Sequence, residues 1–287
     1  MPIHDLSYQR WSGTPSGRSP VSVLARAQLR LLVRRRVVRL LLLPASIIFT
    51  LVWGSMIYLE TRLPDSGPLR QIAATVHVDA RSFERFLTLQ RMVHLLLCLA
   101  AADLLALDRR HRALQIYLAR PLRGRDYVAA KAIAIAVLLG LMTWAPGLFL
   151  VLLKTALRAD VGWLGEQPWL PASIAAYSLA LVLPFTLLTL AISSLSASPR
   201  LAGAQLFAFV ILSNAAAELL SALTRRPAWQ LLSLNADLDQ VASWLFGDVP
   251  RHDVPAWMAG AALGVLSAAA ALVLRWRVRP IDVVGGS

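Results

Sequence analysis

The chain has 287 residues, of which 57% are hydrophobic and 16% are charged, and its mean hydropathy is +0.60. A soluble globular domain carries about 25% charged residues, so this chain lacks the polar side chains needed to cover a globule. Its single cysteine, Cys98, provides neither a disulfide framework nor a cysteine-based metal site. These properties exclude a soluble enzyme, a secreted disulfide scaffold and a disordered chain. They predict an all-α, polytopic membrane protein.

Four long stretches without charge, together with the length and punctuation of the other apolar segments, predict six membrane-spanning helices. A helix needs about 20 apolar residues to cross the hydrocarbon core, and Lys131 and Lys154, for example, bracket 22 uncharged residues. The second span is the weakest of the six because it contains Arg91, His94 and Asp103. The spans are expected at residues 37–58, 86–107, 132–153, 172–195, 201–223 and 254–274.

Basic residues are distributed unevenly between the two sets of loops. If the N-terminus lies inside, the inner side carries 19 Arg and Lys residues and the outer loops carry 10. Arg and Lys are retained on the cytoplasmic side of a membrane, so both termini are expected there. The net charge of +13 would suggest nucleic acid in a soluble protein. Here topology explains the charge, and no nucleic-acid partner is expected.

A basic amphipathic helix is expected directly before the first span. Residues 1–20 form a polar cytoplasmic arm, and in the following segment, 21–36, three arginines lie four residues apart on one helical stripe: Arg26, Arg30 and Arg34. Such a helix lies in the inner membrane interface, where its Arg side chains reach lipid phosphates. A simple topology anchor would use the same residues, and the two interpretations are compatible.

The remaining segments contain few recognisable motifs. Trp229–Phe246 is expected to form one outer interfacial helix, and the absence of repeats and linkers favours a single domain, 1–287. The sequence contains no G-x-x-x-x-G-K-[ST] phosphate loop, no H-E-x-x-H and no G-x-S-x-G. Its five histidines are scattered along the chain. We therefore expect no catalytic residues, no metal and no cofactor in this chain.

A few polar and small residues within the spans are candidates for function or packing. Ionisable groups are costly in hydrocarbon, which singles out Asp103 and Glu218, with Asn214 one turn before Glu218 on the same face. Structural pairing or the wall of a hydrated path is favoured over proton or substrate chemistry. Gly260 and Gly264 form a G-x-x-x-G pattern that predicts close helix packing, either within the chain or between two copies.

The most informative segment is the basic stretch 108–131, which reads DRRHRALQIYLARPLRGRDYVAAK. It is expected to form a cytoplasmic loop with an amphipathic core around Tyr117 and Leu118, which ends at Pro121. Asp126 is a candidate N-cap for the third span. A basic loop that exposes Leu and Tyr fits a docking site for a protein partner, and a contact with anionic lipid explains it equally well.

This loop resembles the signature loop of the permeases of the second type of ATP-binding-cassette (ABC) transporters. The resemblance rests on Asp108, Ala113-Leu114, Tyr117-Leu118, Arg120-Pro121-Leu122, Asp126-Tyr127 and Lys131. Two other stretches are similar to the same family: an N-terminal arm with Tyr8, Arg10, Trp11 and Gly13, and the loop that contains Ser193-Ser194-Leu195 and Pro199-Arg200-Leu201-Ala202-Gly203. The chain departs from the family pattern at Ala119, where Ser is usual, and at Ala130, where Gly is usual.

The resemblance implies the membrane subunit of an ATP-driven exporter in a bacterial cytoplasmic (inner) membrane. Two permeases, as a homodimer or with a paralogue, would form the path within membrane lipids and bind two ATPase subunits that hold ATP and Mg. The loop 108–126 would be the ATPase-coupling loop, with contributions from Asp108, Leu114, Tyr117, Leu118, Arg120, Pro121, Asp126 and Tyr127. A membrane-embedded enzyme would need a convergent set of acids, bases or metal ligands, which the scattered histidines and acids of this chain do not supply. A scaffold or sensor without transport activity fits the composition equally well. The transported substrate cannot be read from the residues.

Overall fold

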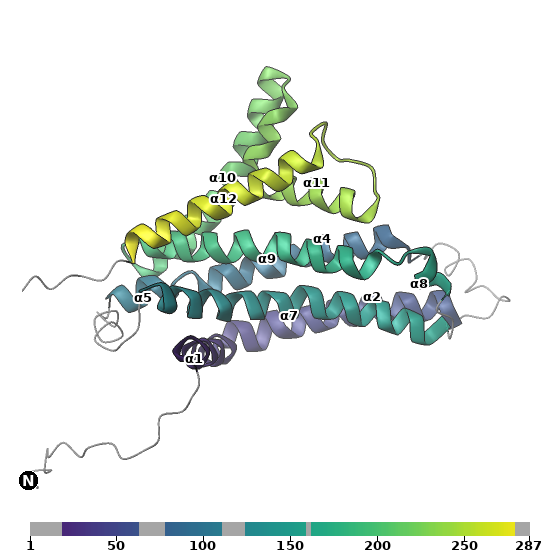
Figure 1. The fold of residues 1–287 in the computed structure, drawn as a ribbon, viewed down its shortest axis with the longest axis horizontal. Coiled ribbons are helices and arrows are strands. Elements are labelled where there is room, and N and C mark those ends of the chain that lie inside the picture. The colour runs from purple at the N-terminus through teal and green to yellow at the C-terminus, as the bar shows by residue number, and fades with distance from the viewer. Residues whose placement is uncertain (1–18, 63–77, 111–123, 159–161, 279–287) are drawn as a thin grey trace, which may run out of the picture.

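The structure is a computed structural model that describes residues 19–62, 78–110, 124–158 and 162–278, and these residues form a bundle of helices (Figure 1). Six of the helices are long and apolar enough to cross a membrane, and each overlaps one predicted span. The spans are formed by η1 (Val38–Leu42) with α2 (Leu43–Arg62), α4 (Ala80–Ala101) with α5 (Leu104–Arg110), α7 (Gly124–Arg158), α9 (Leu170–Leu195), α10 (Pro199–Thr224) and α12 (Ala256–Arg277).

The bundle has two ends, which we name after the short helices that lie there. The α5 end contains α5, the start of α7 and the last residues of α9 and α12, and α1 (Pro20–Arg34) lies near it (Figure 1). The α8 end contains α8 (Gly162–Glu166), the end of α2 and the start of α4. The second span, predicted at 86–107 and weakened by its ionisable residues, is a longer helical segment, Ala80–Arg110, with a short break at Ala102 and Asp103.

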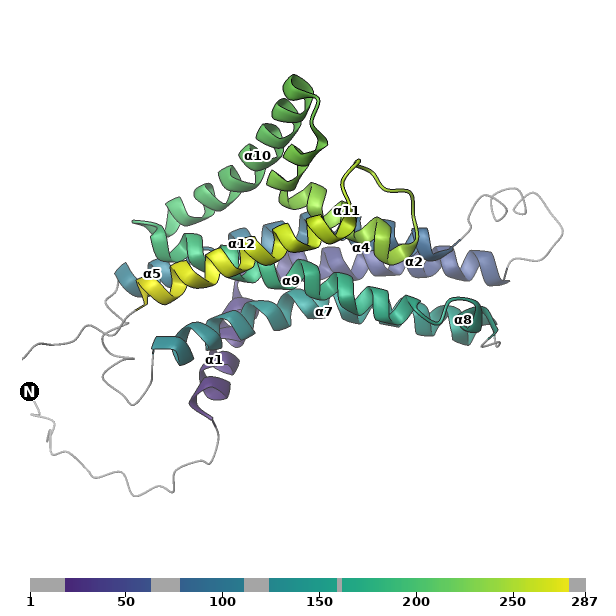
Figure 2. The same cartoon turned by 45° about the horizontal axis from the view of Figure 1, so that its top comes forward.

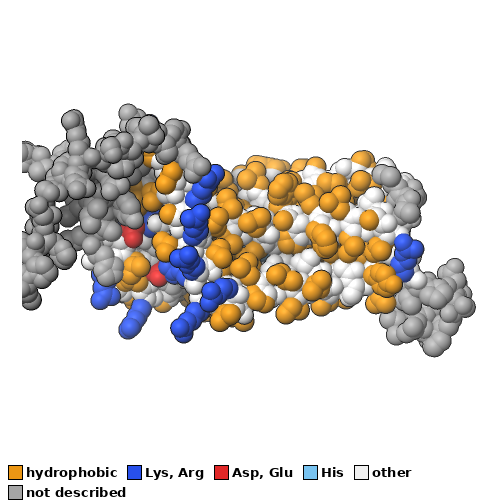
Figure 3. Space-filling model, turned by 90° about the horizontal axis from the view of Figure 1, so that it is seen from below, with side chains coloured by type: hydrophobic (Ala, Val, Ile, Leu, Met, Phe, Trp, Pro, Cys, Tyr) orange, Lys and Arg blue, Asp and Glu red, His pale blue; other side chains and the backbone are white. Residues whose placement is uncertain are grey.

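Helix α1 runs at a steep angle to the spanning helices and is seen almost end-on in Figure 1. Its arginine stripe is exposed, whereas Ala25, Gln28 and Leu32 are buried on the opposite side. The extended backbone of Arg35 makes the corner that leads into the first span. Figure 3 shows a band of Lys and Arg side chains across this face and a hydrophobic surface from that band toward the α8 end. This arrangement is that of a basic interfacial helix beside a hydrocarbon belt, as the sequence predicts.

Helices α7 and α9 form the centre of the bundle. Helix α9 is the most buried of the six spanning helices, and it packs against α7 on one side and α12 on the other. The small residue Gly147 allows α7 to approach α9 closely, because a Cβ atom at this position would lie 2.7 Å from the side chain of Ile174. Helices α7 and α9 are therefore a closely packed pair at the centre of the bundle.

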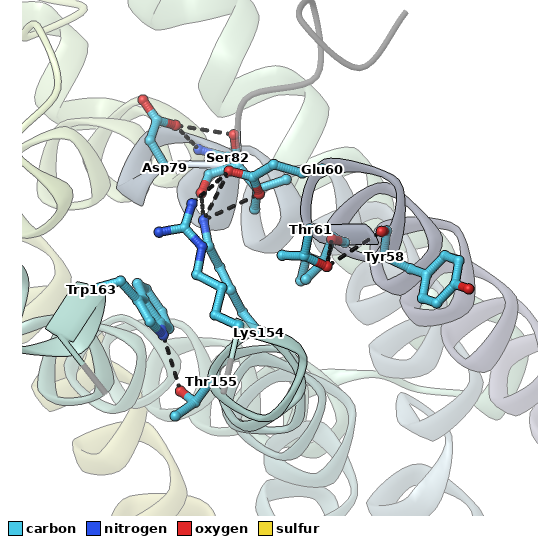
Figure 4. Close-up of polar contacts among 11 residues, drawn as sticks. Tyr58, Glu60, Thr61, Asp79, Ser82, Lys154, Thr155 and Trp163 are labelled. Carbon is cyan, nitrogen blue, oxygen red and sulfur yellow. Dashed lines mark hydrogen bonds and ion pairs between the residues drawn. The ribbon is translucent and has the colours of Figure 1, made fainter. Parts of the chain in front are cut away.

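An ion cluster at the α8 end joins the first three spans. Lys154 of α7 lies 3.3 Å from the carboxylate of Glu60 at the end of α2, and it also donates a hydrogen bond to the carbonyl oxygen of Val78 before α4. Arg158 pairs with the same carboxylate at 3.3 Å, and the ring of Trp163 lies beside the ammonium group. Figure 4 shows Lys154 pointing from α7 toward Glu60. We call Glu60, Lys154 and Arg158 the α8 clamp.

Helix α10 leaves the bundle as it ascends from the α5 end. In Figures 1 and 2 its second half stands away from the other helices, and only four of its residues are buried: Ala202, Leu206, Val210 and Ala217. After Thr224 the chain turns back along α10 as the 3₁₀ helix η2 (Pro227–Leu232) and then enters α11 (Leu234–Phe246). The expectation of a single helix over Trp229–Phe246 is therefore wrong, because Ser233 is not helical and its side chain caps a new helix by accepting from the amide of Ala236.

The glycine pattern of α12 does not pack within this chain. Gly260 and Gly264 are both exposed, and a Cβ atom at either position would meet no atom of the described residues within 4 Å. The expectation of close packing inside the chain is therefore wrong, because α12 contacts α9 and α11 through its other face, with Ala259, Leu263 and Ser267 buried. Packing between two copies stays a prediction.

Candidate functional site

The candidate site lies at the α5 end, where the chain enters and leaves the basic loop. Asp108, in the last turn of α5, accepts a hydrogen bond of 2.5 Å from the hydroxyl of Tyr127 and an ion pair of 2.8 Å from the ammonium group of Lys131. Tyr127 and Lys131 lie one turn apart on α7, which places both on the same face of the helix. Three residues of the sequence motif thus meet although Asp108 and Lys131 are separated by the entire loop.

Lys131 is buried, so its ammonium group requires partners inside the protein. Its side chain is 1% exposed, and its second partner is the carbonyl oxygen of Leu104, in the first turn of α5, at 2.9 Å. The ammonium group also lies 5.2 Å from the centre of the Tyr127 ring. A buried cation is tolerated only when it is paired and hydrogen-bonded, so Lys131 holds α5 in one position against α7.

Helix α9 holds the other side of α5. The hydroxyl of Ser193 accepts hydrogen bonds from the backbone amides of Leu105 and Ala106, at 3.0 and 3.1 Å. These amides belong to the first turn of α5, where an α-helix lacks internal acceptors. Arg109 donates a hydrogen bond to the carbonyl oxygen of Ser194. The stretch around Ser193 that resembles the family in sequence therefore supplies a cap for α5.

We call Asp108, Tyr127, Lys131 and Ser193 the α5 clamp. It fixes a seven-residue helix between α7 and α9, the two central helices of the bundle. The α5 clamp thus connects the helix that leads into the loop to two spanning helices.

A second ion pair connects α1 to the same region. Arg35, at the corner between α1 and the first span, pairs with Asp103 at 2.7 Å and donates a hydrogen bond of 2.5 Å to the carbonyl oxygen of Ala100. Asp103 lies in the break between α4 and α5. Asp103 thus has a structural ion-pair partner, as expected for structural pairing.

Most of the predicted coupling-loop residues lie outside the described residues, namely Leu114, Tyr117, Leu118, Arg120 and Pro121. Asp126 is in the first turn of α7, beside Arg125, so it is not the N-cap that the sequence suggested. The start of α7 is tightly packed, because a Cβ atom on Gly124 would lie 2.7 Å from the carbonyl oxygen of Val278, just after α12. Three spanning helices, α7, α9 and α12, thus come together at the base of the loop.

Asn214 and Glu218, the second pair of candidates, have different surroundings in the structure. Asn214 accepts a hydrogen bond from the hydroxyl of Ser233 and so ties α10 to the start of α11. Glu218 is exposed, and no hydrogen bond or ion pair joins it to another described residue. The two share a face of α10, but only Asn214 has a structural partner in this chain.

A network of charges that sequence reasoning missed joins α4 to α11 and the segment after it. Arg91 pairs with Asp239 at 2.6 Å and donates to the carbonyl oxygen of Asn235 at 3.0 Å. Arg251 pairs with the buried Glu84 at 3.0 Å and with Asp239 at 3.4 Å. The only signal in the sequence was the presence of Arg91 in a predicted span, because such a residue needs a partner from another segment.

The fold and its paired buried charges define an integral, all-α membrane protein with six spanning helices. A family model described as ABC-2 family transporter protein matches residues 37–242, which include five of the spans and the basic loop. The chain belongs to this family, and it is therefore a permease of an ABC transporter, a membrane transport component. Membership of the family implies an ABC ATPase partner. A search of the curated proteins finds no match.

Proposed function

We propose that this permease forms half of an ATP-driven exporter and receives the work of its ATPase through the loop 108–126. The observation that carries the proposal is the α5 clamp, which attaches the short helix at the start of this loop to α7 and α9. A lipid contact alone would not require such a connection to the two central helices.

In the proposed mechanism the loop residues Tyr117, Leu118 and Arg120 bind the ATPase. Tyr117 and Leu118 supply the apolar contact, since aromatic anchors often dominate interfaces, and Arg120 pairs with an acidic site or braces the loop. When ATP closes the ATPase dimer, the loop moves and α5 moves with it. A ligand shifts a conformational equilibrium only if the two states engage it differently, so the contact between loop and ATPase must differ between the two states of the permease.

The wider assembly follows from the same proposal. Two permeases, identical or paralogous, enclose the path, and two ATPase subunits hold ATP and Mg on the side of the loop. The charge asymmetry of the sequence supports a cytoplasmic position for that side and for both termini, and the family resemblance implies a bacterial inner membrane. Exposed Gly260 and Gly264 suit a contact between the two permeases.

The test is the double substitution of Tyr117→Ala with Arg120→Ala. Loss of an anchor of this kind costs about 2 kcal/mol or more, or roughly thirtyfold in affinity for the partner. We expect normal membrane insertion, but the ATPase should no longer co-purify or be stimulated by the permease.

A matched control removes the same chemistry elsewhere at the same end. Arg275→Ala with Trp276→Ala also deletes one arginine and one exposed aromatic side chain, but both belong to the last turn of α12. This variant should retain the ATPase. Wild-type ATPase binding and stimulated turnover in the loop variant would show that the loop is only a lipid anchor.

A further inference from the structure

An apolar groove opens where α10 leaves the bundle. It lies between α10 and α12, with η2 and the first turn of α11 closing it, and its volume is about 690 Å³. Phe209, Ser213 and Ala216 line it from α10, and α12 contributes a face of small and apolar side chains that begins at Trp257. Pockets that bind small organic molecules have volumes of about 300–1,000 Å³, so the groove has the size of a ligand site.

The groove lies well below the tip of α10. The hydroxyl of Ser233, at the start of α11, donates a hydrogen bond to Asn214, which lies ten residues before Thr224 at the end of α10. With a rise of 1.5 Å per residue, the returning chain has descended by about 15 Å when α11 begins. The groove is therefore flanked by the apolar part of α12, a membrane-spanning helix.

A carboxylate is buried in this apolar surface without a partner. Asp237, in the first turn of α11, lines the groove and is 5% exposed, and no hydrogen bond or ion pair joins its side chain to another described residue. The other buried charges of the bundle, such as Lys131 and Lys154, are all paired. A buried ionisable group without a partner is costly, so its position in a ligand-sized groove suits a ligand that carries a cation or a hydrogen-bond donor.

The nearby charged residues do not supply that partner. Asp239, two residues further along α11, points away from the groove, because two residues correspond to about 200° around a helix, and it is occupied by Arg91 and Arg251. No other titratable side chain lines the groove from α10, η2 or α12, and Glu218 of α10 is not among its lining residues.

We propose that this groove binds an apolar molecule that carries a protonated amine, with the amine at Asp237 and the apolar part between α10 and α12. The apolar walls provide most of the contact area, and the carboxylate selects for the amine. The proposal does not depend on coupling to an ATPase, since it concerns binding to the permease itself.

Binding has a second consequence, which follows from the burial of the acid. Burial raises the pKa of Asp237 from 3.8 to about 8, so the empty groove holds the protonated carboxyl at pH 7. An ammonium group at 3 Å favours the charged carboxylate. Entry of the amine should therefore release a proton at pH 7, and this release should fade at pH 9, where the carboxyl has already ionised.

The experiment uses the purified full-length permease in lipid nanodiscs, without an ATPase. Dodecylamine is the probe, since its amine is protonated at neutral pH like that of lysine, and dodecanol is the neutral probe of equal length. We expect saturable binding of dodecylamine with proton release. Asp237→Asn should weaken dodecylamine binding at least tenfold, abolish proton release and leave dodecanol binding unchanged.

Two further variants make the result specific. Ala262→Trp fills the groove from α12 and should abolish binding of both probes. Asp253→Asn, which removes an exposed acid before α12, should bind both probes like the wild type.

Equal binding of dodecylamine to the wild type and Asp237→Asn would overturn the proposal. So would loss of permease dimers in Ala262→Trp with dodecylamine binding intact, because the groove would then belong to a second permease. Neither result would affect the test of the coupling loop.

Discussion

The chain contains only two lysines, and both lie on α7, one near each end of the span. Lys131 and Lys154 are 1% and 4% exposed, and each pairs with one acid, one backbone carbonyl and one aromatic ring. They are 23 residues apart, which corresponds to about 35 Å along the helix. This distance is close to the thickness of a membrane's hydrocarbon core, so we expect the two lysines to lie near its boundaries.

The two clamps differ in what they hold. The acid of the α8 clamp, Glu60, lies at the end of α2, which forms most of the first span, and the clamp joins two long spanning helices. The acid of the α5 clamp, Asp108, lies on a helix of seven residues that leads directly into the basic loop. The same kind of ion pair thus stabilises the bundle at one end and, in our proposal, couples the movement of α5 to α7 and α9 at the other.

The largest expected effect is the removal of one acid from either clamp. Asp108→Leu or Glu60→Leu leaves a buried lysine without its counterion, which typically costs 3–5 kcal/mol. Both variants should show a strongly lowered Tm of the purified permease. Replacing the partners as well should recover most of the loss, because an apolar set of similar volume does not bury a charge. The recovery sets are Asp108→Leu, Tyr127→Phe and Lys131→Met at one end, and Glu60→Leu and Lys154→Met at the other. Failure to recover would mean that the clamps stabilise through something other than charge pairing.

A smaller effect is expected from crowding beside the α5 clamp. Gly124→Ala places a Cβ atom 2.7 Å from the carbonyl oxygen of Val278, and the backbone must shift to accommodate it. Overpacking of this kind costs about 1–3 kcal/mol. Gly140→Ala is the control, since Gly140 lies on the same helix with no other atom within 4 Å of its Cβ position. Equal Tm values for the two variants would contradict the close contact between α7 and the end of α12.

Asp237 sharpens the comparison, because it is a buried acid that has no ion-pair partner among the described residues. Its pKa in the folded protein is about 8, above its ordinary value of 3.8, so folding favours the protonated form. The contribution of this carboxyl to the free energy of unfolding is fully present below about pH 4 and is lost as the pH rises toward 8. Asp237→Asn should therefore raise Tm relative to the wild type at pH 8.5 but change it little at pH 4. A Tm difference that is constant with pH would contradict the burial of this carboxyl.

The smallest effect is expected at Glu218, which is exposed and has no partner among the described residues. Glu218→Gln should change the free energy of unfolding by less than about 0.5 kcal/mol. It should also keep most of the ATPase activity that the permease stimulates. A complete loss of that activity at every pH, with normal assembly, would show that the charge itself is needed in the path.

Much of the fold was predictable because it depends on local patterns. Charge-free stretches of about 20 residues or more predicted four of the spans, apolar segments with few charges predicted the other two, and the four-residue spacing of Arg26, Arg30 and Arg34 predicted α1. The family resemblance brought Asp108, Tyr127 and Lys131 into one motif, and the structure places these three residues in contact.

The remaining features depend on contacts between segments that are distant in sequence. Glu60 and Lys154 lie 94 residues apart, and no local pattern indicates their pairing. The break that creates α5 is stabilised by Ser193 of α9, 88 residues from Leu105. The return of η2 along α10 depends on a tertiary contact at Asn214. Helical periodicity describes one face of one helix and therefore cannot identify its partner.

The most direct test of the account compares ATP turnover in the two recovered clamp variants, each combined with the partner ATPase. The α5-clamp variant, with Asp108→Leu, Tyr127→Phe and Lys131→Met, should bind the ATPase normally, because its loop residues Tyr117 and Arg120 are intact. Its permease-stimulated turnover should fall to the rate of the ATPase alone. The α8-clamp variant, with Glu60→Leu and Lys154→Met, should keep the stimulation. Wild-type stimulation in the α5-clamp variant would contradict the claim that α5 transmits the work of the ATPase.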